Sequence, residues 1–216
     1  GAMMASSDKV YITLQGHGGH GAMPHKAADP VVAAASLVMA LQTVVARNVD
    51  PLQTAVVTVG VLQAGRANNV IPDSARLELS VRALDPEVRR LLEQRITTLT
   101  HAQAQSFGVS AEIDYRRGYA VLINSQEETE LARSVGIELV GADGVTLQGP
   151  PLTGSEDFAY MLEQRPGCYL LVGNGDGDSA GACMVHNPGY DFDDANVAVG
   201  ASYWALLVKR FLVGTD

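Results

Sequence analysis

Histidines supply the first chemical signal in this chain, because four of the five lie in two loops that are rich in glycine or proline. The first loop runs from Gly16 to His25 and also contains His17 and His20. Glycines let a backbone approach a ligand closely, and loops on a rigid scaffold often carry functional residues. The pattern indicates a functional loop, although composition alone fits a simpler interpretation well. Incidental histidines in a solvated loop remain an alternative, and metal ligation ranks lower because no Asp, Glu or Cys accompanies them at ligand spacing.

The second loop places His186 directly before an Asn-Pro-Gly turn. A neutral imidazole held by rigid backbone is a good metal ligand, and a nearby carboxylate can orient it. Asp191, Asp193 and Asp194 offer such carboxylates. The same acidic residues fit an ordinary helix N-terminus, and the residues alone slightly favour that simpler interpretation.

Two further segments contain polar residues that suit substrate contact. Glu156 is one candidate, but Thr153 and Glu156 have the spacing of a capping box, which requires no functional role. The segment 66–72 supplies a guanidinium at Arg66 and an amide at Asn69, which suit a carboxylate or a carbonyl. The competing interpretation of this segment is a polar turn between strands. The sequence contains no P-loop, GxSxG elbow or HExxH motif.

A pattern that occurs twice between residues 8 and 117 predicts how the first loop is held. In each half an alternating strand leads to a helix opened by Asp-Pro, at residues 29–30 and 85–86, and another alternating strand follows. Asp is a preferred N-cap and proline a preferred first helical residue. Strict alternation implies one covered and one wet sheet face. The pattern predicts an α/β (α+β) fold with a ferredoxin-like βαββαβ sandwich, whose four strands carry two helices on one side.

The sequence gives two further expectations for this sandwich. The second strand is expected to place Val57, Val59 and Val61 on one face. The first helix is apolar around most of its axis, with Val31 and Val32 beside three alanines. A snugly buried helix and a helix that contacts a second subunit explain this equally well.

Residues after Tyr119 do not predict a closed layer by themselves. Helices are expected over 126–139 and 156–162, and a final one from Asp193 or Asp194 to Gly214. Residues 168–172 have the apolar composition of one fully buried strand. One strand cannot make a sheet, so we expect this part to pack on something outside the sequence.

Composition and charge restrict the partners. The 216 residues are 47% hydrophobic, and the formal net charge is −9. An acidic chain repels phosphate backbones and anionic lipid, which argues against nucleic acid and membrane as partners. The longest apolar run is interrupted by polar residues and falls short of the ~20 residues of a membrane span. Two cysteines are too few for a disulfide framework, which makes a cytoplasmic location the default.

Five stretches together resemble the aminoacylase and carboxypeptidase family of dinuclear metal peptidases, in its hippurate-hydrolase and auxin-conjugate amidohydrolase branch. They are Met4 to Asp8, Gly18 to His25 followed by Asp29-Pro30, Asn68 to Pro72, Gly154 to Phe158, and His186 to Phe192. Each stretch is weak alone, but their common order and spacing cover nearly the whole chain.

The resemblance implies a domain layout. Residues 8–117 would be a lid that dimerises, residues 118–216 the C-terminal segment of a catalytic domain, and residues 1–7 a connector. The complete enzyme would bind two divalent metal ions, such as zinc, manganese, nickel or cobalt, and act as a homodimer on small N-acyl amino acids.

The resemblance also implies residue roles. His186 would be a metal ligand. His20 would reach across the dimer and polarise the scissile carbonyl of the partner's substrate. Asn69 would be a second substrate contact, and His25 and Glu156 would be further substrate-binding residues.

The family takes its other metal ligands and its general base from stretches that the resemblance places upstream of residue 1. We therefore expect this chain to be an inactive portion of a metal-dependent amidohydrolase that cleaves N-acyl amino acids or similar conjugates. Two alternatives remain open. One is a ferredoxin-like dimerisation or ligand-binding module without catalysis, and the other is a different exopeptidase of the same family, such as a dipeptidase or desuccinylase.

Overall fold

The computed structural model describes residues 1–176, 179 and 182–213. The chain divides into two compact units. The sandwich unit comprises residues 2–123 and 151–163, and the helical unit comprises residue 1, residues 124–150 and residues 164–216. Gly214, expected to end the last helix, lies outside the described residues.

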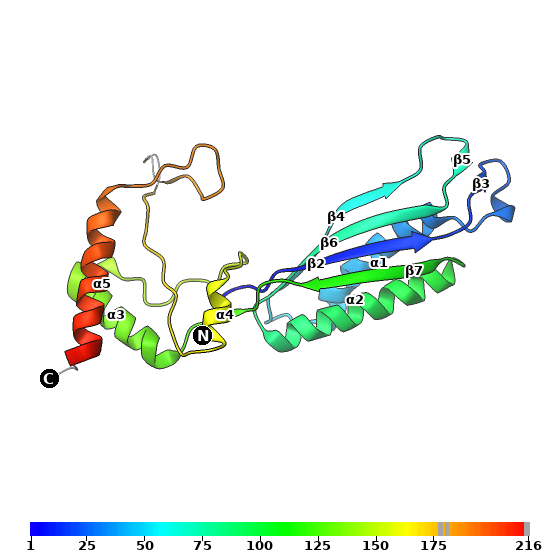
Figure 1. Ribbon diagram of the computed structural model, residues 1–216. Coiled ribbons are helices and arrows are strands. Elements are labelled where there is room, and N and C mark those ends of the chain that lie inside the picture. Colours follow the sequence, from blue (N-terminus) through cyan, green and yellow to red (C-terminus); the bar gives the residue numbers. More distant parts are fainter. Residues whose placement is uncertain (177–178, 180–181, 214–216) are drawn as a thin grey trace. The chain divides into compact units, whose positions relative to one another are not determined.

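The sandwich unit contains a four-stranded antiparallel sheet in the order β4-β6-β2-β7. Its strands are β2 (Asp8–Gln15), β4 (Ala55–Ala64), β6 (Ser74–Ala83) and β7 (Ser110–Arg117). Two long helices, α1 (Pro30–Asn48) and α2 (Pro86–Ser106), pack against each other and on the sheet (Figure 1). The predicted α/β class and the βαββαβ element order are confirmed.

Both helices begin where the Asp-Pro pairs predicted, and the side chains show why. The Asp29 carboxylate accepts a hydrogen bond from the Val31 amide at 2.8 Å. The Asp85 carboxylate accepts from the amides of Glu87 at 2.7 Å and Val88 at 3.1 Å. Each cap satisfies amides that have no partner within the helix.

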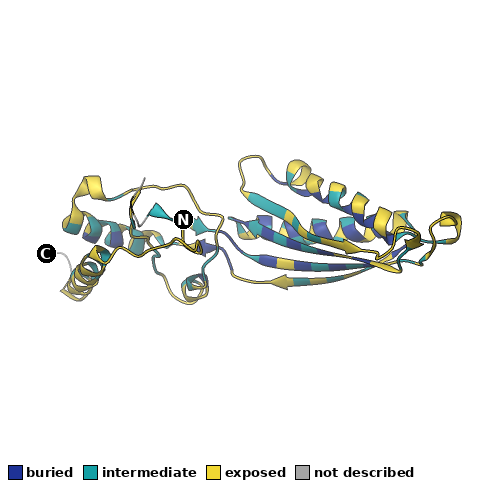
Figure 2. Ribbon diagram, turned by 90° about the horizontal axis from the view of Figure 1, so that it is seen from above, coloured by how far each residue is buried: buried dark blue, intermediate teal, exposed yellow. Residues whose placement is uncertain are grey.

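The core lies between the sheet and the two helices, where Figure 2 shows the buried residues. Alternate residues of the two central strands face it, namely Val10, Ile12 and Leu14 from β2 and Leu77, Leu79 and Val81 from β6. Burial of such side chains is worth roughly 1.5–3 kcal/mol each. The intervening residues form the polar outer face, which matches the predicted alternation.

Strand β4 departs from the predicted alternation at Gly60. Val59 pairs with Leu79, but Val61 pairs with Glu78, so the register shifts between them. A β-bulge inserts one residue and reverses the faces of the residues that follow. Val61 therefore shares a face with Glu78 and not with Val59, and the prediction for Val61 was wrong.

Helix α1 is buried along one side and exposed along another. Ala34, Leu37 and Leu41 are fully buried, whereas Val32 is 52% exposed and Met39 is 70% exposed. By length and composition α1 would be long and apolar enough to cross a membrane, contrary to the expectation from its polar interruptions. A core helix passes the same test, and the buried side of α1 belongs to the sandwich core.

At one end of the sandwich, which we call the root, Arg89, Tyr115 and Gly118 form a polar cluster around the buried Asp8. The Asp8 carboxylate accepts from Arg89 Nε at 3.1 Å, from the Tyr115 hydroxyl at 3.1 Å and from the Gly118 amide at 3.1 Å. Burial raises the pKa of Tyr115, and the Asp8 carboxylate raises it further. Burial lowers the pKa of Arg89, but its hydrogen bond and charge interaction with Asp8 outweigh this and raise the pKa overall.

Short elements complete the root. Strand β1 (Ala2–Met4) pairs with β8 (Leu122–Ile123). Helix α4 (Phe158–Leu162) begins after Asp157 as N-cap, and the Asp157 side chain makes no capping hydrogen bond. The capping box predicted for residues 153–156 is therefore wrong, because the helix starts later than that spacing requires.

The helical unit contains α3 (Gln126–Val140), the short 3-10 helix η2 (Ala142–Gly144) and α5 (Ala195–Val213). The Tyr203 hydroxyl of α5 donates to the Ala132 carbonyl of α3 at 3.1 Å, and Arg210 pairs with Glu138. Asp193 caps α5 by accepting from the Ala195 amide at 3.0 Å, as one of the two predicted caps.

Residues 168–172 form no strand, and the side chains of Leu170, Leu171 and Val172 are exposed. The predicted fully buried strand is therefore wrong. An apolar run becomes a buried strand only when other strands and a covering layer are present, and no described strand pairs with this segment.

Candidate substrate-binding tip and the His186 loop

The tip of the sandwich, residues 16–27 and 65–73, brings together two of the predicted site segments. Strand β3 (Gly19–His20) pairs with β5 (Val70–Ile71), and His20 lies opposite Val70 (Figure 1). The Gly21 amide donates to the Asn69 carbonyl at 2.8 Å. The backbones of His20 and Asn69 are thus neighbours although 49 positions separate them in the sequence.

Glycines permit this close approach of the two loops. A Cβ atom on Gly18 would lie 2.4 Å from the Ile71 carbonyl oxygen, and one on Gly16 would lie 2.2 Å from the Ala28 carbonyl oxygen. Real Cβ contacts are essentially never that short. The contact at Gly18 joins the two loops, whereas the contact at Gly16 lies within the first loop. The predicted close approach of these glycines to a ligand stays a prediction.

Asp73 anchors the His20 loop and was not singled out by the sequence. Its carboxylate accepts from the Gly18 amide at 2.8 Å, and its backbone carbonyl accepts from the Gly16 amide at 2.8 Å. The sequence feature that could have drawn attention to Asp73 is the Pro-Asp pair directly after β5. Nothing in the local sequence shows that its partners Gly18 and Gly16 lie 55 and 57 positions away.

The hydrogen bond to His20 defines which ring nitrogen can donate. The Ala22 amide donates to Nδ1 of His20 at 3.0 Å. Because that nitrogen accepts, the neutral ring must carry its proton on Nε2. His20 is exposed, so its Nε2–H group can donate to a carbonyl oxygen outside the loop.

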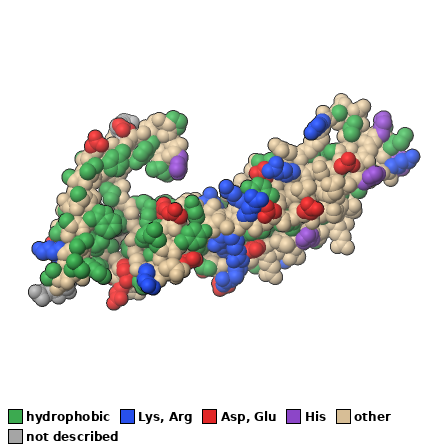
Figure 3. All heavy atoms as spheres, in the orientation of Figure 1, with side chains coloured by type: hydrophobic (Ala, Val, Ile, Leu, Met, Phe, Trp, Pro, Cys, Tyr) green, Lys and Arg blue, Asp and Glu red, His purple; other side chains and the backbone are tan. Residues whose placement is uncertain are grey.

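His25 belongs to the same tip. It lies in η1 (Pro24–Lys26), which follows a turn closed by the Met23 amide donating to the His20 carbonyl at 2.8 Å. Its side chain is exposed. Figure 3 shows histidine side chains in purple at this end of the sandwich unit. The structure thus places His25 near His20 in the chain fold, and its contact with substrate stays a prediction.

A hollow of about 420 Å³ adjoins the tip. Its lining includes Val31 at the start of α1, together with Arg66, Asn68 and Val70. The Arg66 guanidinium makes no ion pair with any residue that the structure describes. A positive group therefore borders this hollow, and contact between Arg66 and a substrate stays a prediction.

Glu156 is not part of the tip. The nearby Gly154 carbonyl accepts from the Ala5 amide at 2.8 Å, and the Ser155 hydroxyl accepts from Arg82 at 3.1 Å. These contacts hold the segment at the root, before β2 begins, whereas the His20 loop follows the far end of β2. Eight strand residues separate the two ends by roughly 26 Å.

His186 has an unusual backbone in the helical unit. It is the one non-glycine residue with a positive φ among the described residues, at 67°. Such a conformation is uncommon for a residue with a Cβ atom, and outliers of this kind concentrate at functional sites. The neighbouring Asn187 and Tyr190 amides close turns onto Met184 and Asn187. This conformation is compatible with a functional role, and the role of His186 as a metal ligand stays a prediction.

The described residues do not form a metal site by themselves. Within the described ranges, no group of three or more His, Cys, Asp or Glu side chains is placed to hold a metal ion. Asp193, a candidate to orient His186, instead caps α5. Any metal that His186 binds would need ligands from outside the described part of the chain.

Comparison with known proteins agrees with this architecture. Residues 5–210 match the model of Peptidase family M20/M25/M40, and the chain belongs to this family. A hippurate hydrolase from Campylobacter jejuni is 41% identical over 212 residues, which are 98% of this chain and 54% of that protein. An N-acetyl-L-cysteine deacetylase from Bacillus subtilis is 37% identical over 98% of this chain and 49% of its own length.

Solved structures show the same fold. A protein from methicillin-resistant Staphylococcus aureus superimposes with a TM-score of 0.85 at 31% identity, over 96% of this chain and 52% of that one. A dinuclear metal-binding peptidase of the M20 family from Bacillus subtilis gives a TM-score of 0.77 at 27% identity, over 100% of this chain and 52% of that one. The family resemblance is confirmed, and the chain spans about half the length of the relatives it matches.

Proposed function

We propose that this chain is part of a metal-dependent amidohydrolase that cleaves the amide bond of N-acyl amino acids or similar conjugates. Family membership supports amide hydrolysis, and the two relatives above carry names that denote hydrolysis of N-acyl amino acids. The chain by itself would be inactive, because its described residues lack a metal-ligand cluster.

The observation that carries the proposal is the hydrogen bond from the Ala22 amide to His20 Nδ1. It leaves Nε2–H as the donor of a neutral imidazole. Amide hydrolysis develops negative charge on the carbonyl oxygen, and a donor already aimed at that oxygen stabilises the transition state. Such a donor typically contributes ~10²–10³ in kcat.

Asn69 is proposed as a second substrate contact beside His20. Its backbone carbonyl is bonded to Gly21, so the residue occupies a fixed place at the tip. His25 is proposed as a further contact from the same loop. Glu156, proposed as substrate-binding on the resemblance alone, lies at the root and would contact substrate separately from these three.

His186 is proposed as one ligand of a site for two divalent ions, with zinc, manganese, nickel or cobalt as candidates. Its strained backbone supports a functional role. The remaining ligands would come from residues outside the described part of this chain, and no catalytic step of the metals follows from the residues described.

We also propose a cytoplasmic homodimer formed through a lid of residues 8–117, with residues 118–216 belonging to the catalytic domain. His20 would then act on the substrate of the partner subunit. The exposed apolar side chains of α1, including Val32 and Met39, support a subunit contact. Two free cysteines fit a reducing compartment, and the acidic charge argues against binding of nucleic acid or membrane.

The proposal is tested by assaying hydrolysis of hippurate and N-acetyl-L-cysteine by the full-length gene product and by the 216-residue chain. We expect turnover from the full-length protein only. In that protein His20→Ala should keep its metal content and lose ~10²–10³ in kcat. His101→Ala, an exposed histidine on α2, is the matched control and should keep full activity.

Absence of hydrolysis by both proteins would instead support a ferredoxin-like dimerisation or ligand-binding module. Cleavage of dipeptides or N-succinyl substrates in preference to these two would indicate another exopeptidase specificity. Full turnover by His20→Ala would contradict the assigned role of His20.

A further inference from the structure

Asp73 connects the two segments of the tip through two acceptors. Its Oδ1 accepts from the Gly18 amide, and its backbone oxygen accepts from the Gly16 amide, both at 2.8 Å. These amides flank His17, so one residue holds the loop on either side of that position. His20 follows only two residues after Gly18.

The Asp73 carboxylate makes no salt bridge with a described residue. Its one side-chain hydrogen bond in the described structure is the bond to Gly18. The carboxylate is therefore placed to hold the loop rather than to balance a neighbouring charge. A charged acceptor makes a hydrogen bond about twice as strong as a neutral one does.

Packing makes this contact specific. A Cβ atom on Gly18 would lie 3.0 Å from Asp73 Oδ1 and 2.4 Å from the Ile71 carbonyl oxygen. Gly19 beyond it has no such neighbour, with only the Ala27 side chain at 3.7 Å. The loop is thus pressed onto residues 71–73 at Gly18, where Asp73 binds it.

The pairing that Asp73 supports is too short to be stable alone. Strands β3 and β5 have two residues each, and even an isolated hairpin of ordinary length is marginal in water. Beyond this ladder lie the bonds from Gly21 to Asn69 and from Ala22 to His20 Nδ1. Loss of the anchor at Gly18 would therefore loosen the segment that orients the His20 ring.

We propose that Asp73 is a positioning residue for His20. By fixing the loop, Asp73 keeps the His20 imidazole in the orientation and tautomer that present Nε2–H to the substrate carbonyl. This inference rests on the proposed role of His20. Misplacement of a catalytic group by about 1 Å can cost ~10²-fold in rate, so Asp73 affects turnover without touching the substrate.

The test compares Asp73→Ala and Asp73→Asn in the full-length enzyme with hippurate as substrate. Asp73→Ala should lower kcat about tenfold to a hundredfold, with KM changed less than about threefold. Asp73→Asn retains an oxygen that accepts from Gly18 and should stay within about threefold of the wild-type kcat.

Asp50→Ala is the matched control, because its exposed carboxylate also accepts from a backbone amide, that of Leu52 at 2.9 Å, in a turn outside the tip. Its kcat should not change. A second readout is the ¹⁵N NMR signature of His20. The wild type and Asp73→Asn should show one neutral tautomer protonated on Nε2, and Asp73→Ala should show exchange between both tautomers.

An Asp73→Ala enzyme with wild-type kcat and an unchanged His20 tautomer would overturn the inference, and so would an Asp73→Asn enzyme as impaired as Asp73→Ala. Failure of the proposed function looks different. In that case His20→Ala itself would keep its turnover, whatever the Asp73 variants do.

Discussion

The carboxylate of Asp8 is fully buried and forms an ion pair with Arg89, whose side chain is 12% exposed. Arg89 Nε lies 3.2 Å from Asp8 Oδ1 and 3.1 Å from Oδ2, and Nη2 also donates to the Gly118 carbonyl at 3.0 Å. The pair therefore joins the start of β2, the first turns of α2 and the end of β7 at the root.

Loss of Arg89 should destabilise the protein strongly. Arg89→Ala leaves the Asp8 charge buried without its cation, and breaking such a pair costs roughly 3–5 kcal/mol in the free energy of unfolding. Urea unfolding followed by circular dichroism measures this loss.

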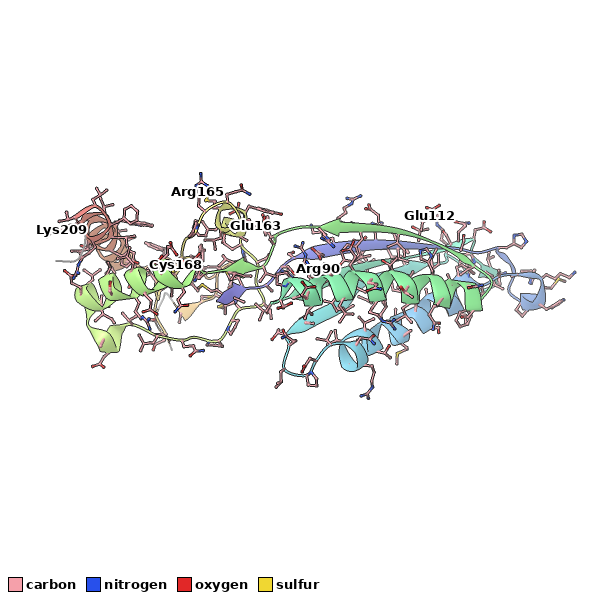
Figure 4. The ribbon with its side chains drawn as sticks, turned by 90° about the horizontal axis from the view of Figure 1, so that it is seen from below. Arg90, Glu112, Glu163, Arg165, Cys168 and Lys209 are labelled. Atoms are coloured by element: carbon pink, nitrogen blue, oxygen red, sulfur yellow. The ribbon has the colours of Figure 1, made fainter. Side chains whose placement is uncertain are left out.

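Arg90→Ala is the control for that experiment. Arg90, labelled on α2 in Figure 4, forms an exposed pair with Glu87 on the same helix. An exposed pair contributes about 0–1 kcal/mol. Equal losses for Arg89→Ala and Arg90→Ala would show that the root pair adds nothing through its burial.

Tyr115 should make stability fall at high pH. Its pKa is raised in the folded protein by burial and by Asp8, whereas in the unfolded chain it lies near ~10. The unfolded chain therefore releases the proton first, and the contribution of Tyr115 to stability, complete below pH ~10, is lost as pH rises above it.

The measurement is the urea midpoint of the wild type and of Tyr115→Phe at pH values from ~8 to ~11. Tyr115→Phe should be less stable at pH ~8, because it loses the hydrogen bond to Asp8, and should decline less steeply above pH ~10. Tyr119→Phe, which alters an exposed tyrosine, should decline as the wild type does. Parallel curves for all three proteins would contradict the prediction.

Adjacent glycines at the tip should respond differently to alanine. In Gly18→Ala the new Cβ would meet backbone atoms at 2.4 Å, so the loop must move away from Ile71. We expect kcat for hippurate to fall by about tenfold or more, since displacement of this size misplaces His20. Gly19→Ala adds a Cβ with its nearest contact at 3.7 Å and should keep kcat. The reverse ranking would mean that the packing at Gly18 does not position His20.

His186→Ala tests the ligand assignment in the full-length protein. If His186 holds a metal, the variant should lose about one of two bound ions per subunit and its activity, because a binding site that lacks a ligand loses affinity. Elemental analysis of the purified protein measures the metal directly. His101→Ala provides a control with the same chemical change, and unaltered metal content in His186→Ala would end the assignment.

Local signals predicted local features well. Asp29 and Asp85 marked the starts of α1 and α2 because a cap bonds amides two or three residues away. The bulge at Gly60 was missed because register depends on the partner strand, which the sequence of β4 does not contain. The apolar run at residues 168–172 was misread for a related reason, since burial depends on what surrounds a segment.

In the candidate site, too, local features were predicted and features that depend on distant residues were not. His20 was identified from a loop of unusual composition, and its link to Asn69 came from a family resemblance rather than from spacing. Asp73 was missed because its contact with Gly18 spans 55 positions and leaves no periodic trace. The tautomer of His20 could not be predicted either, because it depends on where one backbone amide, that of Ala22, lies in the folded loop.

Strand β2 runs without interruption from the root to the tip. A small rotation at the root therefore becomes a larger displacement of the tip. Eight residues span roughly 26 Å, so a rotation of about 5° at Gly118 would displace His20 by roughly 2 Å. That displacement is enough to break a hydrogen bond to a substrate carbonyl. In the proposed role of His20, the rigidity of the Asp8 cluster would limit how far the imidazole is displaced from the substrate carbonyl. Substitutions at the root would then reduce turnover without contacting the substrate.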